Sequence, residues 1–357
     1  MTRTINFFLP LLTVMICASV GIRAQAPATK TVEQQYKNIQ VLQGLPATEL
    51  DPTMAFISGS LGVTCDYCHV AAYEKDDKEH KIAARKMIKM EFDINKASFN
   101  GNTEVTCNTC HRGKSRPVAV PAVAQNLFGP APPRPAQPQL PTPDSIFEKY
   151  VQALGGAAAW DKITSRVTKG SRIGADNVLV PEDVYQKAPN KIVTTTTYPG
   201  NAFSNGFNGT TAWGFSSKDG EQQLPAAFLK QLKDDADFEK PLHLKGQFAN
   251  LRVVGQEKVN DRPAWVVVAT KEDRQRERLF FDTETGLLLR RYVESKTILG
   301  NLPLQTDYDD YRDVDGVKLP FLIHWSFPGR IWGRKITEIK QNVAIEDAKF
   351  ELPQKQP

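Results

Sequence analysis

Two short motifs hold four of the five cysteines in this 357-residue chain. They read Cys65-Asp66-Tyr67-Cys68-His69 and Cys107-Asn108-Thr109-Cys110-His111. Each has the form C-x-x-C-H, the attachment sequence for a c-type haem. The two thiols can form thioether bonds to the vinyl groups of one porphyrin, and the histidine that follows can bind the iron as proximal ligand. Two copies of the motif predict two haem c groups and favour electron transfer as the function.

Zinc binding and disulfide formation are the alternative uses of paired cysteines. Two C-x-x-C pairs can form a structural zinc site, but 38 residues separate Cys68 from Cys107. A compact zinc ribbon has only about 15–20 residues there, and a site of four thiolates needs no histidine after each pair. A C-x-x-C disulfide is usually catalytic, and no thioredoxin-like βαβ pattern lies nearby. The motifs therefore favour haem over both alternatives.

Residues 1–26 are typical of a secretory signal peptide, with an apolar stretch at 7–20 and a cleavage-like Ala24-Gln25-Ala26. The apolar stretch is too short for a comfortable membrane span. Cys17 lies inside it and is an alternative lipidation site, although the residues before it are not the small ones that such a site prefers. An uncleaved signal could also serve as an anchor. We expect an exported, periplasmic protein, with membrane association left open.

A low-spin electron carrier needs a second, distal ligand on each iron, and methionine is a common choice. Met1 and Met15 lie in the signal peptide, and the other three methionines all precede the second motif: Met54, Met87 and Met90. A helical methionine is usually a core filler. The depletion of methionine elsewhere favours iron binding instead, by Met54 at the first haem and by Met87 or Met90 at the second.

Both sets of methionines fall in expected helices. Met54 lies on a short helix that Asp51 can cap and that Pro52 suits in its first turn. A longer helix is expected over residues 79–96. Its apolar face has the 3.6-residue period and consists of Ile82, Ala83, Met87, Met90, Ile94 and Ala97, whereas Lys81, Arg85, Lys89 and Lys96 lie opposite. His80 is an alternative distal ligand.

Residues 37–116, about a quarter of the chain, resemble the cytochrome c subunit of photosynthetic reaction centres. That family repeats a methionine-bearing helix followed by a turn and C-x-x-C-H. The matching segments are Met54 with the first motif, and Ala84-Arg85-Lys86-Met87-Ile88-Lys89-Met90 with Val105-Thr106-Cys107-Asn108-Thr109-Cys110-His111-Arg112-Gly113. The family uses the first methionine of its Met-x-x-Met helix, so the resemblance favours Met87 over Met90. The family has four haems, whereas two such units are present here.

The rest of the chain differs in character from the motif region. Residues 116–143 contain nine prolines and read as a semi-rigid spacer. A helix is expected from Asp144 to Leu154, where Gly155-Gly156 ends it, and another over 225–238. Runs rich in β-branched and aromatic residues are expected to form strands joined by close turns, at 178–185, 191–198, 264–270, 278–282, 287–294, 319–327 and 334–339. Such a meander is antiparallel.

This second part resembles periplasmic lipoprotein carriers, in which a half-barrel wraps around helices, and the segment from Asp310 to Pro320 is familiar from such chains. The resemblance implies that the apolar strand faces could hold a lipid or another hydrophobic ligand, and formation of the core is the alternative. We therefore expect four parts: a signal peptide (1–26), a small α-helical dihaem cytochrome module (27–116), a Pro-rich linker (117–143), and an α+β domain with a curved antiparallel sheet (144–357).

Charge and composition exclude few partners but do not indicate nucleic-acid binding. The formal charge is +5, and removal of residues 1–26 takes away two arginines and no acidic residue, which leaves +3. Lysines and arginines on the 79–96 helix could steer an acidic redox partner, although a solvated face is the ordinary explanation. We expect an electron carrier with redox protein partners, which the family resemblance places at a membrane-bound complex. The alternatives are a dihaem peroxidase, with one open iron face, and a lipid-binding protein with an accessory redox module.

Overall fold

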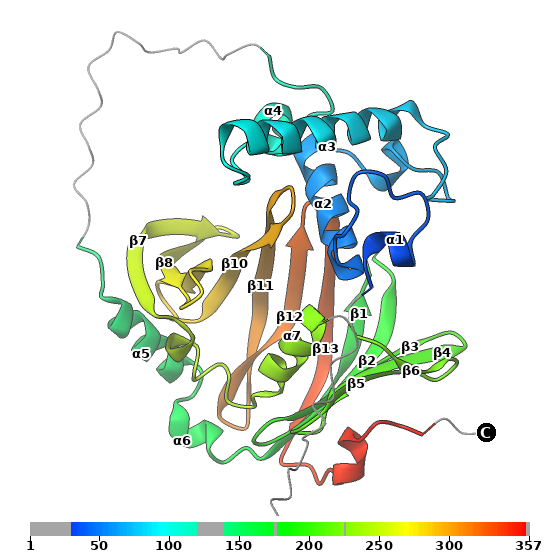
Figure 1. The fold of residues 1–357 in the computed structure, drawn as a ribbon. Helices are drawn as coiled ribbons and strands as arrows, with labels where there is room; N and C mark the ends of the chain where they lie inside the picture. The colour runs from blue at the N-terminus through cyan, green and yellow to red at the C-terminus, as the bar shows by residue number, and fades with distance from the viewer. Residues whose placement is uncertain (1–29, 120–138, 175–176, 225, 355–357) are drawn as a thin grey trace, which may run out of the picture.

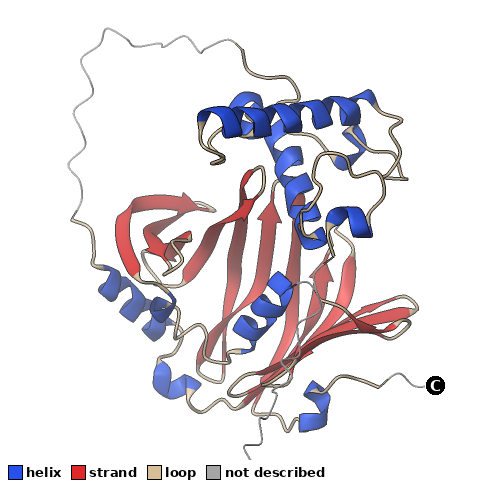
Figure 2. Cartoon of the chain, in the orientation of Figure 1, coloured by secondary structure: helices blue, strands red, loops and turns tan. Residues whose placement is uncertain are grey.

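The computed structural model describes residues 30–119, 139–174, 177–224 and 226–354. The signal-peptide prediction, Cys17 and most of the predicted linker lie outside these ranges. The first described range is helical (Figures 1 and 2). Its elements are α1 (Val32–Gln35), α2 (Leu50–Leu61), α3 (Glu79–Ser98) and α4 (Cys107–His111), with short 3-10 turns η1 (Ala47–Glu49) and η2 (Cys65–Tyr67). Among the described helices, none is long and apolar enough to cross a membrane.

Helix α2 is the expected carrier of Met54. Its N-cap is Glu49 and not Asp51, which instead lies in the first turn, where a carboxylate favours the positive end of the helix dipole. Pro52 also lies near the start, where a missing N–H costs nothing. The helix ends at Gly62, which has φ = +65° and so terminates it in the left-handed conformation. These local signals fix a three-turn helix just before the first motif.

Helix α3 confirms the expected helix but packs on the face opposite to the one expected from its period. Ile82, Met87 and Met90 are exposed, each by 42–45% of their surface. The buried face instead carries Lys81, Ile88, Glu91 and Asn95. The prediction of a solvated basic face is therefore wrong for Lys81, whose ammonium donates to the carbonyls of Tyr73 and Lys75. A long cationic side chain can pack its stem inside when carbonyl oxygens accept its hydrogen bonds.

The second part of the chain is one open, antiparallel, 13-stranded sheet, in the order β6-β5-β4-β3-β2-β1-β13-β12-β11-β10-β9-β8-β7. The strands are β1 (Ser165–Ile173), β2 (Leu179–Lys187), β3 (Lys191–Tyr198), β4 (Asn201–Phe207), β5 (Ala212–Ser216), β6 (Gly220–Gln222), β7 (Asn250–Val259), β8 (Arg262–Thr270), β9 (Arg276–Asp282), β10 (Leu288–Thr297), β11 (Gly300–Val314), β12 (Val317–Phe327) and β13 (Arg330–Gln341). Nearly every pairing joins consecutive strands, so the predicted meander is confirmed. The exception is β1, which pairs with β13.

Three helices accompany the strongly curved sheet: α5 (Pro143–Ala153), α6 (Ala157–Trp160) and α7 (Ala226–Ala236). Figure 1 shows α7 inside the curve and the helical region at one rim of the sheet. The sequence predicts that α5 starts at Asp144, but its N-cap is Thr142, whose hydroxyl accepts from the Ser145 N–H at 3.2 Å. The fold class expected from the sequence, a helical region followed by a half-barrel α+β domain, is confirmed.

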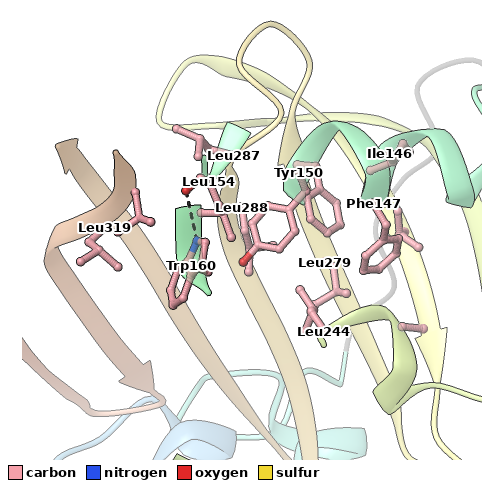
Figure 3. Packing of buried hydrophobic residues seen from close by; sticks show 14 of the residues in the cluster. Ile146, Phe147, Tyr150, Leu154, Trp160, Leu244, Leu279, Leu287, Leu288 and Leu319 are labelled. Atoms are coloured by element: carbon pink, nitrogen blue, oxygen red, sulfur yellow. Dashed lines mark hydrogen bonds between the residues drawn. The ribbon is translucent and has the colours of Figure 1, made fainter. Parts of the chain in front are cut away.

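The largest apolar cluster joins α5 and α6 to the sheet (Figure 3). Phe147 and Tyr150 on α5 both meet the ring of Phe281 edge-on, with centroids 5.1 and 5.3 Å apart. Trp160 is fully buried and donates its indole N–H to the Leu154 carbonyl at 3.2 Å. Helix α7 adds Leu232 and Ala236 to a second cluster over β2, β3 and β4. The helices thus cover apolar strand faces as core.

Candidate functional site

The second attachment motif forms helix α4, a single capped turn. Thr106 is its N-cap: its hydroxyl accepts from the Thr109 N–H at 3.3 Å, and the Thr109 hydroxyl accepts from the Thr106 N–H at 3.0 Å. This reciprocal pair satisfies two donors that a helix start leaves free. The turn ends at Arg112 and Gly113, both with positive φ. Cys107, Cys110 and His111 are therefore held on one rigid turn.

The first motif is a tighter turn with the same register. Cys65–Tyr67 form the 3-10 turn η2, and the His69 N–H donates to the Cys65 carbonyl at 3.0 Å, an α-type bond. The Lys78 ammonium donates to the Asp66 carbonyl on the same turn. In both motifs, one turn therefore carries both thiols and the histidine.

Both motif histidines are oriented by a backbone carbonyl. The His69 Nδ1 lies 3.3 Å from the Tyr73 oxygen, and the His111 Nδ1 lies 2.9 Å from the Lys114 oxygen. A carbonyl oxygen can only accept, so in a neutral ring this contact assigns the proton to Nδ1 and leaves the lone pair on Nε2 for a metal. Burial lowers the pKa of His69, and nearby Lys81, Arg85 and Lys78 lower it further. The neutral imidazole is the form that binds iron.

The four motif cysteines are free thiols in this structure, and none forms a disulfide. Cys65 and Cys110 are exposed, and Cys68 and Cys107 are half-buried. In the described ranges no three side chains of Cys, His, Asp or Glu converge as a metal-binding group. In each motif one thiol is exposed and lies on the same turn as an oriented histidine, which suits covalent haem attachment.

Cys107 has an unexpected partner in Glu91 on α3. Its thiol donates to the Glu91 Oε2 at 3.0 Å, while the buried Oε1 has no partner in the described part of the chain. Burial raises the pKa of the Glu91 carboxyl, and the hydrogen bond from Cys107 only partly opposes this. A thioether sulfur carries no hydrogen, so haem attachment at Cys107 would remove this hydrogen bond.

The predicted distal ligands occupy two kinds of site. Met54 is half-buried beside the apolar cluster that includes Phe56 and Ile57. Met87 and Met90 are 45% exposed on the free apolar face of α3. The face of α3 that contacts the second motif and the loop before it, through Glu91 and Asn95, is the opposite one. The ligand assignments stay predictions. The ring of His80, the alternative ligand, stacks on Tyr67 of the first motif at 4.0 Å.

The two C-x-x-C-H turns are joined through backbone contacts. The Gly113 N–H, just after the second motif, donates to the Ser60 carbonyl of α2 at 2.8 Å. Gly62, just before the first motif, lies so close that a Cβ there would be 2.1 Å from the Gly113 oxygen. Only a residue without a side chain allows such an approach. The end of α2 thus links both attachment turns.

Two polar residues that the sequence reasoning missed organise this region. The Asn95 amide donates to the Val105 carbonyl at 2.7 Å and accepts from the Val105 N–H at 2.9 Å, which fixes the loop before the second motif to α3. Asp76 pairs with Arg85 and Lys81 at 2.8 and 3.1 Å. These bonds hold the pKa of Asp76 well below its usual range. The sequence signal for these contacts was the row of polar residues on α3 opposite the methionines, which includes Lys81, Glu91 and Asn95.

Among the described residues of the sheet domain, no group of three His, Cys, Asp or Glu side chains could hold a metal ion. A cavity of about 670 Å³ lies beside the start of β1 and is lined by Thr164, Ser165, Lys187, Asn342 and Glu346 among others. Because its lining includes several polar and charged side chains, the cavity does not favour the binding of a lipid.

The part of the chain that contains the two motifs is similar in sequence to known proteins. Residues 15–132 match the family model described as the photosynthetic reaction centre cytochrome C subunit. Cytochrome c-554 of Chloroflexus aurantiacus is 39% identical over 89 residues, which cover 22% of this chain and 21% of that protein. The photosynthetic reaction center cytochrome c subunit of Rubrivivax gelatinosus is 35% identical over 99 residues, 26% of this chain and 27% of that protein. The chain thus spans only about a fifth to a quarter of the length of these curated relatives.

Solved structures resemble a larger share of the chain at low identity. A DUF1329 family protein from Desulfovibrio piger covers 58% of it with a TM-score of 0.43 and 11% identity. A LolA superfamily protein from Nitrosomonas europaea covers 59% with a TM-score of 0.41 and 15% identity. The similarity in sequence lies instead in the part of the chain that contains both C-x-x-C-H turns. That part is similar to the cytochrome c subunits of photosynthetic reaction centres.

Proposed function

We propose that this chain is a periplasmic dihaem c-type cytochrome that passes single electrons between redox proteins and is a carrier rather than an enzyme. The observation that carries the proposal is the pair of C-x-x-C-H turns, each with its histidine Nδ1 held by a carbonyl. When bound, haem c supplies a one-electron iron couple. The similarity to reaction-centre cytochrome subunits supports this class of function.

The proposed roles follow from the motifs. Cys65, Cys68, Cys107 and Cys110 tether two porphyrins, and His69 and His111 bind the irons on the proximal side. Met54 and Met87 are proposed as distal ligands, with Met90 and His80 as alternates. Six-coordinate irons leave no face for a substrate, which separates this proposal from a dihaem peroxidase.

The organisation and setting are also part of the proposal. We place a signal peptide at 1–26, the haem module at 27–116, the Pro-rich linker at 117–143 and the sheet domain at 144–357. Export is required because covalent haem attachment to C-x-x-C-H occurs outside the cytoplasm. The partners are redox proteins, of which a membrane-bound complex is one candidate. A hydrophobic ligand of the sheet domain is a weaker proposal, since α5 and α7 already cover apolar strand faces.

The test is a haem count on the full chain, expressed in a periplasm that has the cytochrome c maturation system. Pyridine haemochrome absorbance and intact mass should both give two covalent haems on a chain that lacks residues 1–26. The double variants Cys65→Ala/Cys68→Ala and Cys107→Ala/Cys110→Ala should each retain one haem. A colourless protein, or one haem in the unmodified chain, would contradict the proposal. Rapid cyanide binding by the resting protein would favour the peroxidase instead.

A further inference from the structure

The turn between β10 and β11 inserts into the helical region. Its Leu299 is fully buried and Leu302 nearly so, and both belong to one apolar cluster with Phe56 and Ile57 of α2. The partly buried members of that cluster include Met54 and Cys107. A side chain from the sheet therefore lies in the same core as a predicted iron ligand and a predicted haem anchor. Figure 1 shows this hairpin rising towards α2 and α3.

The tip of the hairpin has a fixed shape with no spare room. The Thr297 hydroxyl donates to the Gly300 carbonyl at 2.7 Å and accepts from the Leu299 N–H at 3.3 Å. Gly300 has φ = +143°, and a Cβ there would lie 2.5 Å from the Phe56 ring and 3.1 Å from the Thr106 methyl. The backbone of the tip thus fits between α2 and the cap of α4.

A neighbouring turn of the sheet contacts α2 as well. Gly59, on the same helix as Met54, lies against Pro328 of the β12–β13 turn, so that a Cβ on Gly59 would be 2.2 Å from the Pro328 Cβ. Partly buried Phe327 packs on the same apolar cluster. Helix α2 is therefore held by two turns of the sheet, and its position relative to α4 depends on them.

We propose that the β10–β11 tip is a positioning element between the two proposed haem units, with Leu299 as its main side chain. It holds the helix that carries Met54 against the turn that carries Cys107, and it keeps water from the core between them. The apolar shell around a haem controls solvent access and hence the reduction potential. This inference rests on the proposed haem binding, and it gives the sheet domain a role in tuning the haems.

The test compares variants of the haem-loaded full chain by spectroelectrochemical titration. Leu299→Ala should lower at least one midpoint potential, because admitted water stabilises the more highly charged ferric state. It should also weaken the absorption band that methionine–iron coordination gives. Leu299→Met, which keeps an apolar side chain of similar size, should leave both the midpoint potentials and the absorption band as in the parent. Ile298→Ala is the matched control, since Ile298 is on the same tip but 39% exposed, and it should change neither.

A second readout does not involve haem. A specific protease site placed within residues 120–138 allows the folded chain to be cut between its two parts. The fragments of the parent should co-elute from a gel-filtration column, and those of Leu299→Ala should separate at least in part. Gly300→Ala places a methyl group against Phe56 and should have the same effects as Leu299→Ala. It replaces Leu299→Ala in the test if Leu299→Ala does not fold.

The outcomes separate the two proposals. A chain without covalent haem refutes the proposed function, whatever the fragments do. Two haems with unchanged potentials and spectra in both Leu299→Ala and Gly300→Ala refute the positioning role. If the fragments of these variants nevertheless separate, the tip only holds the helical region on the sheet.

Discussion

At the scale of single residues, the methionines proposed as iron ligands can be tested one at a time. Because loss of a thioether ligand changes both the spectrum and the potential of a haem, Met54→Ala and Met87→Ala should each abolish part of the methionine–iron absorption band. Each should also lower one of the two midpoint potentials. Met90→Ala is the matched control, being three residues away on α3 and equally exposed. A spectrum altered by Met90→Ala and unaltered by Met87→Ala would reverse our assignment.

Glu277 is a second residue with a measurable effect, this time on stability. Its carboxylate is fully buried and binds Arg291 through two hydrogen bonds, at 2.6 and 2.9 Å, and Lys271 at 2.8 Å. Burial alone would raise the pKa of Glu277, but these partners outweigh burial and hold that pKa below its ordinary value of 4.5. A carboxyl with a lowered folded-state pKa contributes stability above the unfolded-state pKa and loses it on acidification.

Glu277→Gln should therefore lower the free energy of unfolding at neutral pH by roughly 1–3 kcal/mol, the usual loss for a buried charged hydrogen bond. The difference from the parent should shrink as the pH falls below 4.5. Thermal melts followed by circular dichroism at neutral and acidic pH measure both effects. Glu257→Gln, which breaks an ion pair with Arg278 that is 39–50% exposed, should change little. A pH-independent difference would show that the charge of Glu277 is not the cause.

At the scale of elements, the end of α2 links the two attachment turns. Gly62→Ala must accommodate both a positive φ and a contact of 2.1 Å with the Gly113 oxygen. Gly101→Ala has a similar φ of +80° but open space around it, so it pays only the backbone cost of about 1 kcal/mol. We expect Gly62→Ala to lose clearly more stability than Gly101→Ala in urea unfolding. Equal losses would mean that the approach of the two turns is not a constraint.

At the scale of the whole molecule, the sheet and the helical region share a core. Gly59 lies inside α2, where alanine normally stabilises a helix by about 0.5–1 kcal/mol. Here Pro328 occupies the space that a Cβ would need. Gly59→Ala should therefore lower the free energy of unfolding of the chain. In a Pro328→Gly background the same substitution should raise it instead. A double-mutant cycle measured by urea unfolding gives the coupling, and additive effects would argue against close packing of the two parts.

The shared core also qualifies the domain division predicted from composition. The Pro-rich segment separates two parts that differ in fold class, but Leu299 and Phe327 belong to the same apolar cluster as residues of α2. The helical region and the sheet are therefore joined by contacts between residues that lie far apart in the sequence. We therefore expect the helical region and the sheet to stabilise each other.

The sequence by itself determined the attachment turns, the helices that carry the methionines and the antiparallel meander, because each depends on residues close together in the chain, and the family resemblance supplied the half-barrel class. Strands β1, β4, β5, β6, β7 and β11 were not predicted, since pairing partners and not local propensity decide such strands. The packed face of α3 was also misjudged, because Lys81 and Glu91 find partners that only the fold brings near. The placement of Leu299 and Met54 in one apolar cluster belongs to the tertiary structure alone. They are 245 positions apart in the chain, and no local pattern encodes packing over that distance.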